Sequence, residues 1–501
     1  MARHLPLDHH CAWREEAEAL RAEVGRIGGE LDTLKAQMAA LQRHVFGRKT
    51  EKLPPVAAEL KGEQQSPEQQ AEREAAALKK RRERAARKDQ EALCREVHHA
   101  VPPEERHCPF CGSEDLKPLG AGRTTVVYEY LPARFERQVH VQEVLACKCG
   151  KGVVTAPPPP KVVDRGEYGP GLLAHVVTAK CADSIPLHRL AQALERVGVP
   201  MARSTLTDLF HRAAELTAPL SMHLLLQVRA SEVVWADETP MRVLDVKKTK
   251  LGYLWTFLTQ RLTGEWLIAY RFSMGRGGKT PREVLGGTTG ALVVDAYTGY
   301  NAVLVPKGRV RVGCWAHCRR RFFEALATAP ESREALDLIL ALYRVEHEAR
   351  AADVVRTHAH RALRQEKSVP ILDALHAWLT AQAPLHPPKG PLGTAISYTL
   401  KQWEALCRFA ADERLPLDNN RAENSLRRAS LGRKNFLFVG HAAAGENLAG
   451  LYALVATCLA NGVNPEEYLA DVLLRVQTHP NSRIGELLPL EWKHARAADS
   501  S

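Results

Sequence analysis

Apolar residues near the N-terminus recur at alternating steps of four and three positions. The series starts at Trp13, passes through Leu20 and Val24, and continues to Val45. This spacing is typical of the apolar seam of a coiled coil. Residues 1–53 are therefore predicted to form an oligomerisation helix, and the protein a homo-oligomer. The alternative is one amphipathic helix that packs against its own chain.

A basic polar linker, residues 54–100, is predicted to follow this helix. Its most charged part, Lys79–Lys88, holds seven basic residues and one acid. Such a run can neutralise DNA phosphates and give salt-sensitive binding that does not depend on base sequence. A solvated charged linker explains the same composition equally well.

Two close pairs of cysteines lie in the next segment, residues 101–156. They are Cys108, Cys111, Cys147 and Cys149. Four thiolates suit tetrahedral Zn²⁺, so a small domain with structural zinc is predicted. Because the second pair has only one residue between its members, unpaired cysteines stay possible, and His107 is an alternative ligand. Alternating residues in Thr124–Tyr130 and Arg134–Val144 predict strands between the pairs.

The prolines Pro157–Pro160 mark a boundary, and residues 157–230 follow with a helical pattern. Ser184 and Pro186 are expected to open one helix, which stops before Pro200. Ser204 is expected to cap the next helix. Two helices joined by a short glycine turn are typical of a helix-turn-helix, although a supporting helical hairpin has the same pattern.

Short runs rich in β-branched and aromatic residues begin at Ser231. The predicted strands are Glu232–Ala236, Tyr253–Leu258, Trp266–Phe272, Ala291–Val294 and Arg309–Val312, with a helix at Pro281–Leu285. Residues 231–318 are therefore predicted to form the first part of an α/β domain. Residues 319–410 are predicted to be a helical insertion, residues 411–475 the last part of the domain, and residues 476–501 a tail.

Three acids occupy informative places in this pattern. Asp237 lies on or near the first strand, and Asp295 ends the fourth, where open α/β sheets bind their ligands. Glu423 falls in a helix that Asp418 can cap. Carboxylates are the ligands that Mg²⁺ prefers, and two such ions can stabilise both oxygens of an in-line displacement. The three acids are therefore predicted to converge.

Less specific interpretations exist for each of these positions. Glu423 with Arg427 fits an ordinary ion pair four residues apart on a helix. Asp418 fits a simple cap, while Glu238 and Asp245 fit solvated neighbours of the first acid.

A second cluster, Cys314, His317 and Cys318, lies at a strand-to-helix junction. Core packing explains it better than metal binding, although His317 can also hydrogen-bond a scissile phosphate. Basic residues that can meet DNA phosphates accompany this junction and the third acid. They are Arg319, Arg320, Arg321, Arg427, Arg428, Arg433 and Lys434.

Composition limits the classes of protein to consider. A chain of 501 residues with 45% hydrophobic content predicts a globular protein of two to four domains, and a net charge of +11 favours a polyanionic partner. The longest apolar stretch, Leu448–Ala460, is interpreted as too short for a bilayer and broken by Gly450. Eleven cysteines, an odd number, fit reduced thiols. The expected location is cytoplasmic, at the nucleoid, without membrane contact.

Several long motifs resemble those of the insertion sequence 66 family of transposases. They are VVWADETP, LVVDAYTGYNAV, GCWAHCRRRFFEAL, DNNRAENSLRRASLGRKNFLFVG and NGVNPEEYL. The resemblance implies a ribonuclease-H-like catalytic domain in a multidomain α+β protein. It also implies a zinc finger at the cysteine pairs and accessory proteins encoded by the same element. Leu258–Arg261 replaces a common acidic pair, and Arg428 replaces a common proline.

The function predicted from these motifs is that of a DNA transposase. Asp237 and Asp295 would hold the first of two Mg²⁺ (or Mn²⁺) ions, and Glu423 would complete the second. The protein would bind the ends of a mobile element, cleave them and transfer the strands to target DNA. The alternatives are a zinc-containing DNA-binding regulator without catalysis and a structure-selective nuclease with the same ions.

Overall fold

A computed structural model describes most of the C-terminal two thirds of the chain. The described residues are 16, 18–28, 75–83, 136, 138–146, 153–157, 159–163, 166–246 and 248–499. Residues 55–137 form one compact unit, and residues 1–54 with 138–501 form another. The prediction of a strand over Arg134–Val144 was largely wrong, because β1 spans only Val144–Ala146 and pairs with β2, Val153–Thr155.

The described part of the predicted coiled coil is helical over residues 18–28. Three of its seam positions, Leu20, Val24 and Ile27, are 56%, 69% and 51% exposed. The helix therefore does not bury these side chains against its own chain. Self-association stays a prediction, and the other seam residues lie outside the described part.

The helices directly before the central sheet are α4 (Pro170–Cys181), α5 (Leu187–Arg196) and α6 (Arg203–Ala230). Pro186 precedes the first residue of α5, as predicted. Ser204 does not cap the next helix, because α6 already begins at Arg203. The apolar side of α6 buries Leu206, Phe210 and Leu224 in the core.

The central sheet has five strands in the order β5-β4-β3-β6-β7. They are β3 (Val233–Asp245), β4 (Lys248–Gln260), β5 (Trp266–Ser273), β6 (Gly290–Val293) and β7 (Arg309–Val312). The first three are antiparallel, and β6 and β7 add in parallel after helix α7 (Lys279–Leu285). The predicted strands exist, but β3 and β4 are much longer than expected.

Two helices cover one face of this sheet: α14 (Asn420–Phe436) and α15 (Ala442–Ala460). On α15, Thr457 exchanges hydrogen bonds with the backbone of Ile268 on β5. The expectation that Gly450 breaks this apolar stretch was wrong, because α15 runs through Gly450 and is 19 residues long. By length and composition α15 could cross a membrane, but 67% of its apolar window is buried inside the protein, as in a core helix.

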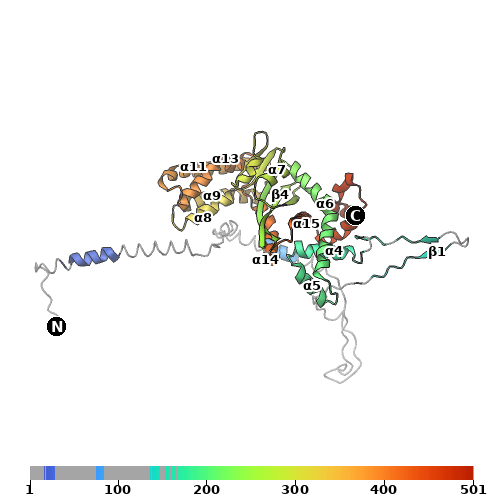
Figure 1. Cartoon of the computed structure of the whole chain (residues 1–501). Helices are drawn as coiled ribbons and strands as arrows, with labels where there is room; N and C mark the ends of the chain where they lie inside the picture. The colour runs from blue at the N-terminus through green and yellow to red at the C-terminus, as the bar shows by residue number, and fades with distance from the viewer. Residues whose placement is uncertain are drawn as a thin grey trace, which may run out of the picture. The chain divides into compact units, whose positions relative to one another are not determined.

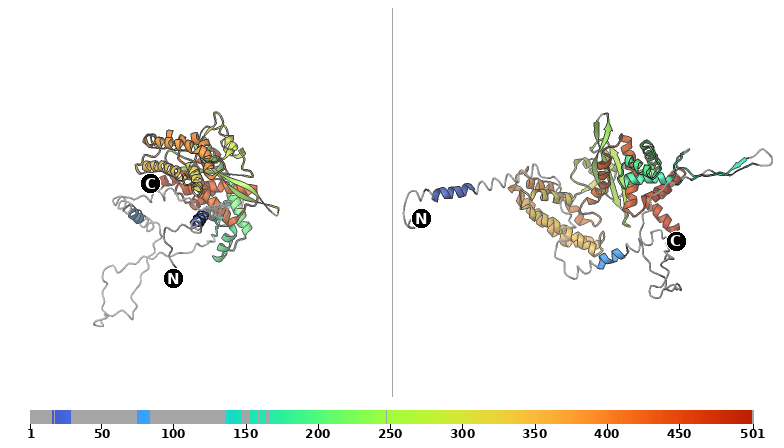
Figure 2. Two further views of the ribbon diagram at one scale, coloured as in Figure 1. Left: turned by 90° about the vertical axis from the view of Figure 1, so that its left-hand side faces the viewer. Right: turned by 90° about the horizontal axis from the view of Figure 1, so that it is seen from below.

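The segment predicted as a helical insertion is helical. It contains α8 (Trp315–Ala325), α9 (Ser332–Ala351), α10 (His358–Leu363), α11 (Val369–Gln382), α12 (Pro391–Lys401) and α13 (Trp403–Cys407). Figure 1 shows α8, α9, α11 and α13 grouped on one side of the sheet, away from α4–α6, and both views of Figure 2 keep these yellow-to-orange helices together. The chain ends with α16 (Pro465–Arg475) and α17 (Pro489–Asp499).

We predict that Gly290→Ala destabilises the sheet by about 2 kcal/mol or more. Gly290 has a φ of +98°, and a Cβ there would overlap the carbonyl oxygen of Glu232, which accepts the amide of Ala291 where β6 meets β3. The measurement is the urea midpoint of unfolding.

The matched control is Gly287→Ala. Its φ is also positive, at +73°, but no atom lies within 4 Å of a Cβ. It should cost only the strain of the left-handed backbone, on the order of 1 kcal/mol. Equal losses in the two variants would contradict the close approach of Gly290 to β3.

Candidate active site

Asp237 on β3 and Asp295 just after β6 lie at the same level, because the two strands are parallel neighbours. The β3–β6 ladder pairs Val233 with Ala291 and Trp235 with Val293. Asp237 is two residues further along β3, and Asp295 is two residues beyond the end of β6 at Val293. The amide of Glu238 donates to Asp237 Oδ1 at 2.9 Å, and the amide of Tyr297 donates to Asp295 Oδ1 at 2.9 Å. Both carboxylates therefore stand at one edge of the sheet.

Glu423 reaches the same edge from the first turn of α14. Two anchors flank it. Asn419 Nδ2 donates to the carbonyl of Ala236 at 2.9 Å, immediately before Asp237. Ser425 Oγ hydrogen-bonds Thr256 Oγ1 at 3.0 Å, and Thr256 is the cross-strand partner of Asp237. The start of α14 is thus fixed to both strands beside the first aspartate.

The predicted apolar stripe of α14 explains why the helix lies this way. Ala422, Leu426 and Ala429 are at most 3% exposed and face the sheet. Glu423 follows the first of these and is left at the edge of the buried stripe. No ion pair joins it to Arg427 within the described residues, so the interpretation of an ordinary helix pair was wrong.

The electrostatics of Asp237 reflect this crowding. Burial, then the adjacent Glu238, and then Glu423 and Asp295 together raise the pKa of Asp237 to about 8. A carboxyl with this environment holds its proton unless a positive charge arrives. The donors are carboxylate oxygens only, which is the set that Mg²⁺ prefers. The residues therefore fit a divalent cation.

The acids are near one another but do not already enclose an ion. Among the described residues, no group of three His, Cys, Asp or Glu side chains is close enough to hold a metal. Binding of a cation would have to draw the three side chains together.

Glu238 is not a solvated neighbour, and its environment was not foreseen. Its side chain is 3% exposed. Arg276 pairs with it at 2.8 Å, and Tyr300 Oη donates to its other oxygen at 2.6 Å. The guanidinium of Arg276 also lies 4.1 Å from the ring centre of Tyr297. An isolated Arg in a glycine-rich loop gave no signal of this pairing in the sequence.

Asp295 is supported from the other side by β7. Arg311 donates to the carbonyl oxygen of Asp295, to that of Tyr297 at 3.2 Å, and to Asn301 Oδ1 at 2.9 Å. Burial lowers the pKa of Arg311 while the charge of Asp295 opposes that effect. The turn that carries Asp295 is therefore held by one half-buried guanidinium.

His317 lies beside the third acid. Its Nε2 is 3.7 Å from Glu423 Oε1, and its buried Nδ1 has no hydrogen-bond partner among the described residues. Cys314 and Cys318 beside it are 3% and 0% exposed, which agrees with core packing. The Cys314 sulfur accepts the amide of Asn419 at 3.2 Å, so the cysteine helps to fix the start of α14.

The seven basic residues predicted as possible DNA contacts lie in different environments. Arg319 is 3% exposed, so its side chain offers no open surface for a phosphate. Arg433 is half-buried and donates to Thr239 Oγ1 at 3.1 Å. Arg428 is exposed and donates to the carbonyl of Ala182 at 2.9 Å. The exposed members are Arg320, Arg427, Arg428 and Lys434.

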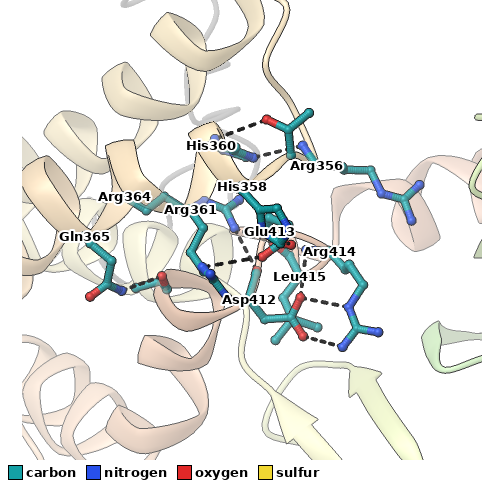
Figure 3. A network of polar contacts seen from close by, with 12 residues as sticks. Arg356, His358, His360, Arg361, Arg364, Gln365, Asp412, Glu413, Arg414 and Leu415 are labelled. Atoms are coloured by element: carbon teal, nitrogen blue, oxygen red, sulfur yellow. Dashed lines mark hydrogen bonds and ion pairs between the residues drawn. The ribbon is translucent and has the colours of Figure 1, made fainter.

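A buried guanidinium ties the helical insertion to the segment that leads into α14. Arg364 pairs with both oxygens of Glu346 at 2.7 and 2.8 Å. Its Nη1 donates to the carbonyls of Phe409, Asp412 and Leu415 at 2.7, 3.1 and 3.0 Å. Figure 3 shows Arg364 reaching this segment from its own helix.

A second contact joins the insertion to the same segment. Tyr343 on α9 donates to Asp418 Oδ2 at 2.9 Å, and Asp418 Oδ1 accepts the amide of Asn420 at 3.0 Å. Asp418 is not the N-cap of α14, because that position is Asn419. The side chain of Asp418 instead accepts the amide of the first helical residue and is a docking point for the insertion.

The four cysteines predicted to bind zinc lie outside the described residues. So does most of the segment between them. Their role stays a prediction from the sequence.

Comparison with protein families gives three matches along the chain. Residues 165–447 match the model of the transposase IS66 family. Residues 453–490 match the IS66 C-terminal element, and residues 105–150 match the zinc-finger binding domain of transposase IS66. The first match includes the three acids, and the third includes the four cysteines.

Relatives of similar length occur in Sinorhizobium fredii. Uncharacterized protein y4hP is 31% identical over 413 residues, which cover 78% of this chain and 74% of the relative. Uncharacterized protein y4jD is 31% identical over 410 residues, which cover 78% and 79%. Uncharacterized protein y4qI is 34% identical over 384 residues, which cover 73% and 70%.

We predict that Asp237→Asn raises the thermal midpoint of the metal-free protein at pH 8. The substitution removes one of the crowded carboxylates, and each 1 kcal/mol gained is worth roughly 2–4 °C. Mg²⁺ should raise the midpoint of the wild type and have little effect on the variant. Scanning fluorimetry with chelator and with Mg²⁺ measures both. Asp245→Asn, on the same strand beside Lys250, is the control. An equal Mg²⁺ response in Asp237→Asn would count against this ligand.

We predict that the pair of Glu346 and Arg364 makes the insertion sensitive to acid. Burial opposes ionisation of Glu346, but hydrogen bonds from His360 and Arg364 outweigh it and lower its pKa from 4.5 to about 2. The unfolded chain therefore binds a proton at higher pH than the folded chain. The stability that the pair contributes, on the order of 3 kcal/mol, is complete above pH 5 and disappears toward pH 2.

Acid titration followed by tryptophan fluorescence tests this dependence. Glu346→Gln should unfold more easily at pH 7, by about 3–5 kcal/mol, because Arg364 is left buried without a counter-charge. The variant should also lose the change in stability between pH 5 and pH 2. Glu348→Gln, two residues away in an exposed pair with Lys367, should behave like the wild type. If the stability of Glu346→Gln changed with pH in the same way as that of the wild type, Glu346 would not be the source of the acid sensitivity.

Proposed function

The chain belongs to the IS66 family of transposases, and from that premise we propose that it cuts the ends of a mobile DNA element and joins them to target DNA. The catalytic domain of this family is of the DDE, ribonuclease-H-like type. The observation that carries the proposal is the approach of three carboxylates from distant parts of the chain to one edge of the sheet. Asp237 on β3 and Asp295 just after the parallel strand β6 lie at the same level, and the start of α14 is bonded to β3 beside Asp237.

The three acids are proposed as the ligands of two Mg²⁺ or Mn²⁺ ions. Such ions, when bound, supply Lewis acidity to both oxygens of an in-line displacement at phosphorus. The charges of both other acids act on Asp237, so Asp237 is proposed as a ligand that both ions would share. Asp295 would complete the first and Glu423 the second. The pKa of Asp237 is raised to about 8 because its carboxyl is buried and lies near Glu238, Glu423 and Asp295.

The protein's own contribution is positioning. Asn419 and Ser425 hold Glu423 against β3 and β4, so the carboxylate can approach Asp237 without moving the helix. His317, 3.7 Å from Glu423, is proposed to orient that carboxylate or to meet the scissile phosphate. Such fixed geometry matters because small displacements of reacting groups cost large factors in rate.

The N-terminal segments are proposed to bind and pair the DNA ends. Cys108, Cys111, Cys147 and Cys149 would hold a structural Zn²⁺ that shapes a DNA-binding module, in agreement with the family match over residues 105–150. The seam positions of residues 18–28 that are exposed would join two copies of the chain. Pairing of two copies suits an enzyme that must hold two element ends at once.

Exposed basic side chains near the third acid are proposed to hold the DNA backbone. Arg320, Arg427, Arg428 and Lys434 are the open candidates. Accessory proteins encoded by the same element are further proposed partners. A regulator without catalysis is disfavoured because all three acids and their supporting hydrogen bonds are intact.

We expect Asp237→Asn, Asp295→Asn and Glu423→Gln each to lower Mg²⁺-dependent strand transfer at least about a thousandfold, since each removes a ligand of the reacting site. Binding to the element end should survive. The assay incubates the protein with DNA from the flanks of the gene and separates cleaved from joined products on gels, with binding measured in parallel.

Asp245→Asn is the matched control on β3 and should retain wild-type activity. Full strand transfer by any of the three acid variants would exclude that residue from the site. Cleavage by the wild type without joined products would instead favour a nuclease.

A further inference from the structure

The residue that follows Asp237 lies on the other face of the sheet. Asp237 points toward α14, because its cross-strand partner Thr256 hydrogen-bonds Ser425 of that helix. Successive side chains of a strand point to opposite faces, so Glu238 points away from α14. Its side chain is buried there, at 3% exposure. Glu238 therefore stands behind the candidate cation site rather than in it.

A hydrogen bond joins Glu238 to the segment that carries Asp295. Tyr300 Oη donates to Glu238 Oε2 at 2.6 Å. Tyr300 follows Asp295 closely in the chain and lies in the short 3₁₀ helix η2 (Thr298–Ala302). Both ends of the bond are buried, since Tyr300 is 1% exposed. The bond thus links the residue next to Asp237 on β3 with the turn that follows Asp295.

A second link reaches the same turn through Arg276. The guanidinium of Arg276 pairs with Glu238 Oε1 at 2.8 Å. The backbone carbonyl of Arg276 accepts a hydrogen bond from Tyr297 Oη at 2.6 Å, and its guanidinium lies over the Tyr297 ring. The rings of Tyr297 and Tyr300 meet edge to face, with their centres 6.0 Å apart. Both oxygens of Glu238 therefore hold the turn, one directly and one through Arg276.

Asp295 needs such support because it lies beyond the end of β6. The carboxylate of Asp295 accepts the amide of Tyr297, so its position follows that of the turn. Arg311 fixes this turn to β7. The contacts of Glu238 fix the same turn to β3, which is the strand that carries Asp237.

We propose that Glu238 is a positioning residue, which through Tyr300 sets the distance between Asp237 and Asp295 so that both carboxylates can bind one divalent cation. This inference rests on the proposed function, because it takes the two aspartates as ligands of a shared ion. Residues that hold metal ligands in place without touching the metal commonly contribute about ten- to a hundredfold in metal affinity. Loss of the Tyr300 hydroxyl should therefore weaken cation binding although every ligand is still present.

A purely structural role of these contacts is the alternative. Trp255, the cross-strand partner of Glu238, is fully buried and packs edge to face on Tyr300, with ring centres 5.8 Å apart. Tyr300→Phe keeps this ring packing and removes only the hydroxyl. A structural role predicts lower stability and an unchanged affinity for the cation, whereas a positioning role predicts a lower affinity as well.

The test measures binding of Mn²⁺ to the full-length protein, with free Mn²⁺ followed by its electron paramagnetic resonance signal. Tyr300→Phe should raise the dissociation constant at least about tenfold. Asp295→Asn removes a proposed ligand and should raise it further, which identifies the site that is titrated. The Mg²⁺ concentration for half-maximal strand transfer should rise in Tyr300→Phe by the same factor, while saturating Mg²⁺ restores most of the rate.

Tyr468→Phe is the matched control. Tyr468 on α16 is fully buried, and its hydroxyl donates to the carbonyl of Leu487 at 2.8 Å. The variant removes the same atom from a bond of similar length that does not involve the acids. It should lower the thermal midpoint of unfolding, as Tyr300→Phe does, and leave Mn²⁺ binding at the wild-type level.

Two results would overturn the proposal. One is wild-type Mn²⁺ affinity in Tyr300→Phe when Asp295→Asn has lost it. The other is an equal loss of affinity in Tyr468→Phe, which would trace the effect to a general loosening of the fold. Mn²⁺ binding requires neither cleavage nor joining. A wild type that binds Mn²⁺ but joins no DNA would therefore reject the proposed function and leave this test intact.

Discussion

Like-charged carboxylates repel, and the catalytic half of this protein is built around holding three of them at one edge of a sheet. Asp237 shows the consequence, since burial and its acidic neighbours raise its pKa to about 8. Such an arrangement is unfavourable on its own and persists only if the surrounding structure fixes it. The backbone does part of this work, because β3 and β6 pair in parallel and bring Asp237 and Asp295 to the same level.

The third carboxylate needs more support because it comes from a helix. Asn419 and Ser425 bond α14 to the two strands beside Asp237. Behind them, Arg364 and Tyr343 of the insertion hold the segment that leads into the helix. These contacts give the insertion a structural function, because they fix the start of α14. This helix packs on the sheet although it lies about one hundred residues after the last strand in the chain.

The same sheet shows how one element can serve two purposes. The inner half of β3 is buried on both faces and belongs to the core, whereas its outer half is buried only against the catalytic helix. The acids stand where this change occurs. One strand therefore contributes both to the core and to the candidate cation site.

The sequence by itself determined much of this architecture. Local apolar runs predicted all five strands, and the stripe of Ala422, Leu426 and Ala429 predicted how α14 packs. Motif order identified the family, and it is the basis on which the three acids are proposed as metal ligands. The sequence underestimated the lengths of β3 and β4. The parts of these strands beyond Asp237 are exposed on one face, so their apolar pattern is weak. The sequence also missed the pairing of Glu238 with Arg276, and it included Arg319 among the possible DNA contacts although its side chain is buried. Only the tertiary structure decided these points. Burial and pairing of a charged side chain depend on residues far away in the sequence, which local periodicity does not contain.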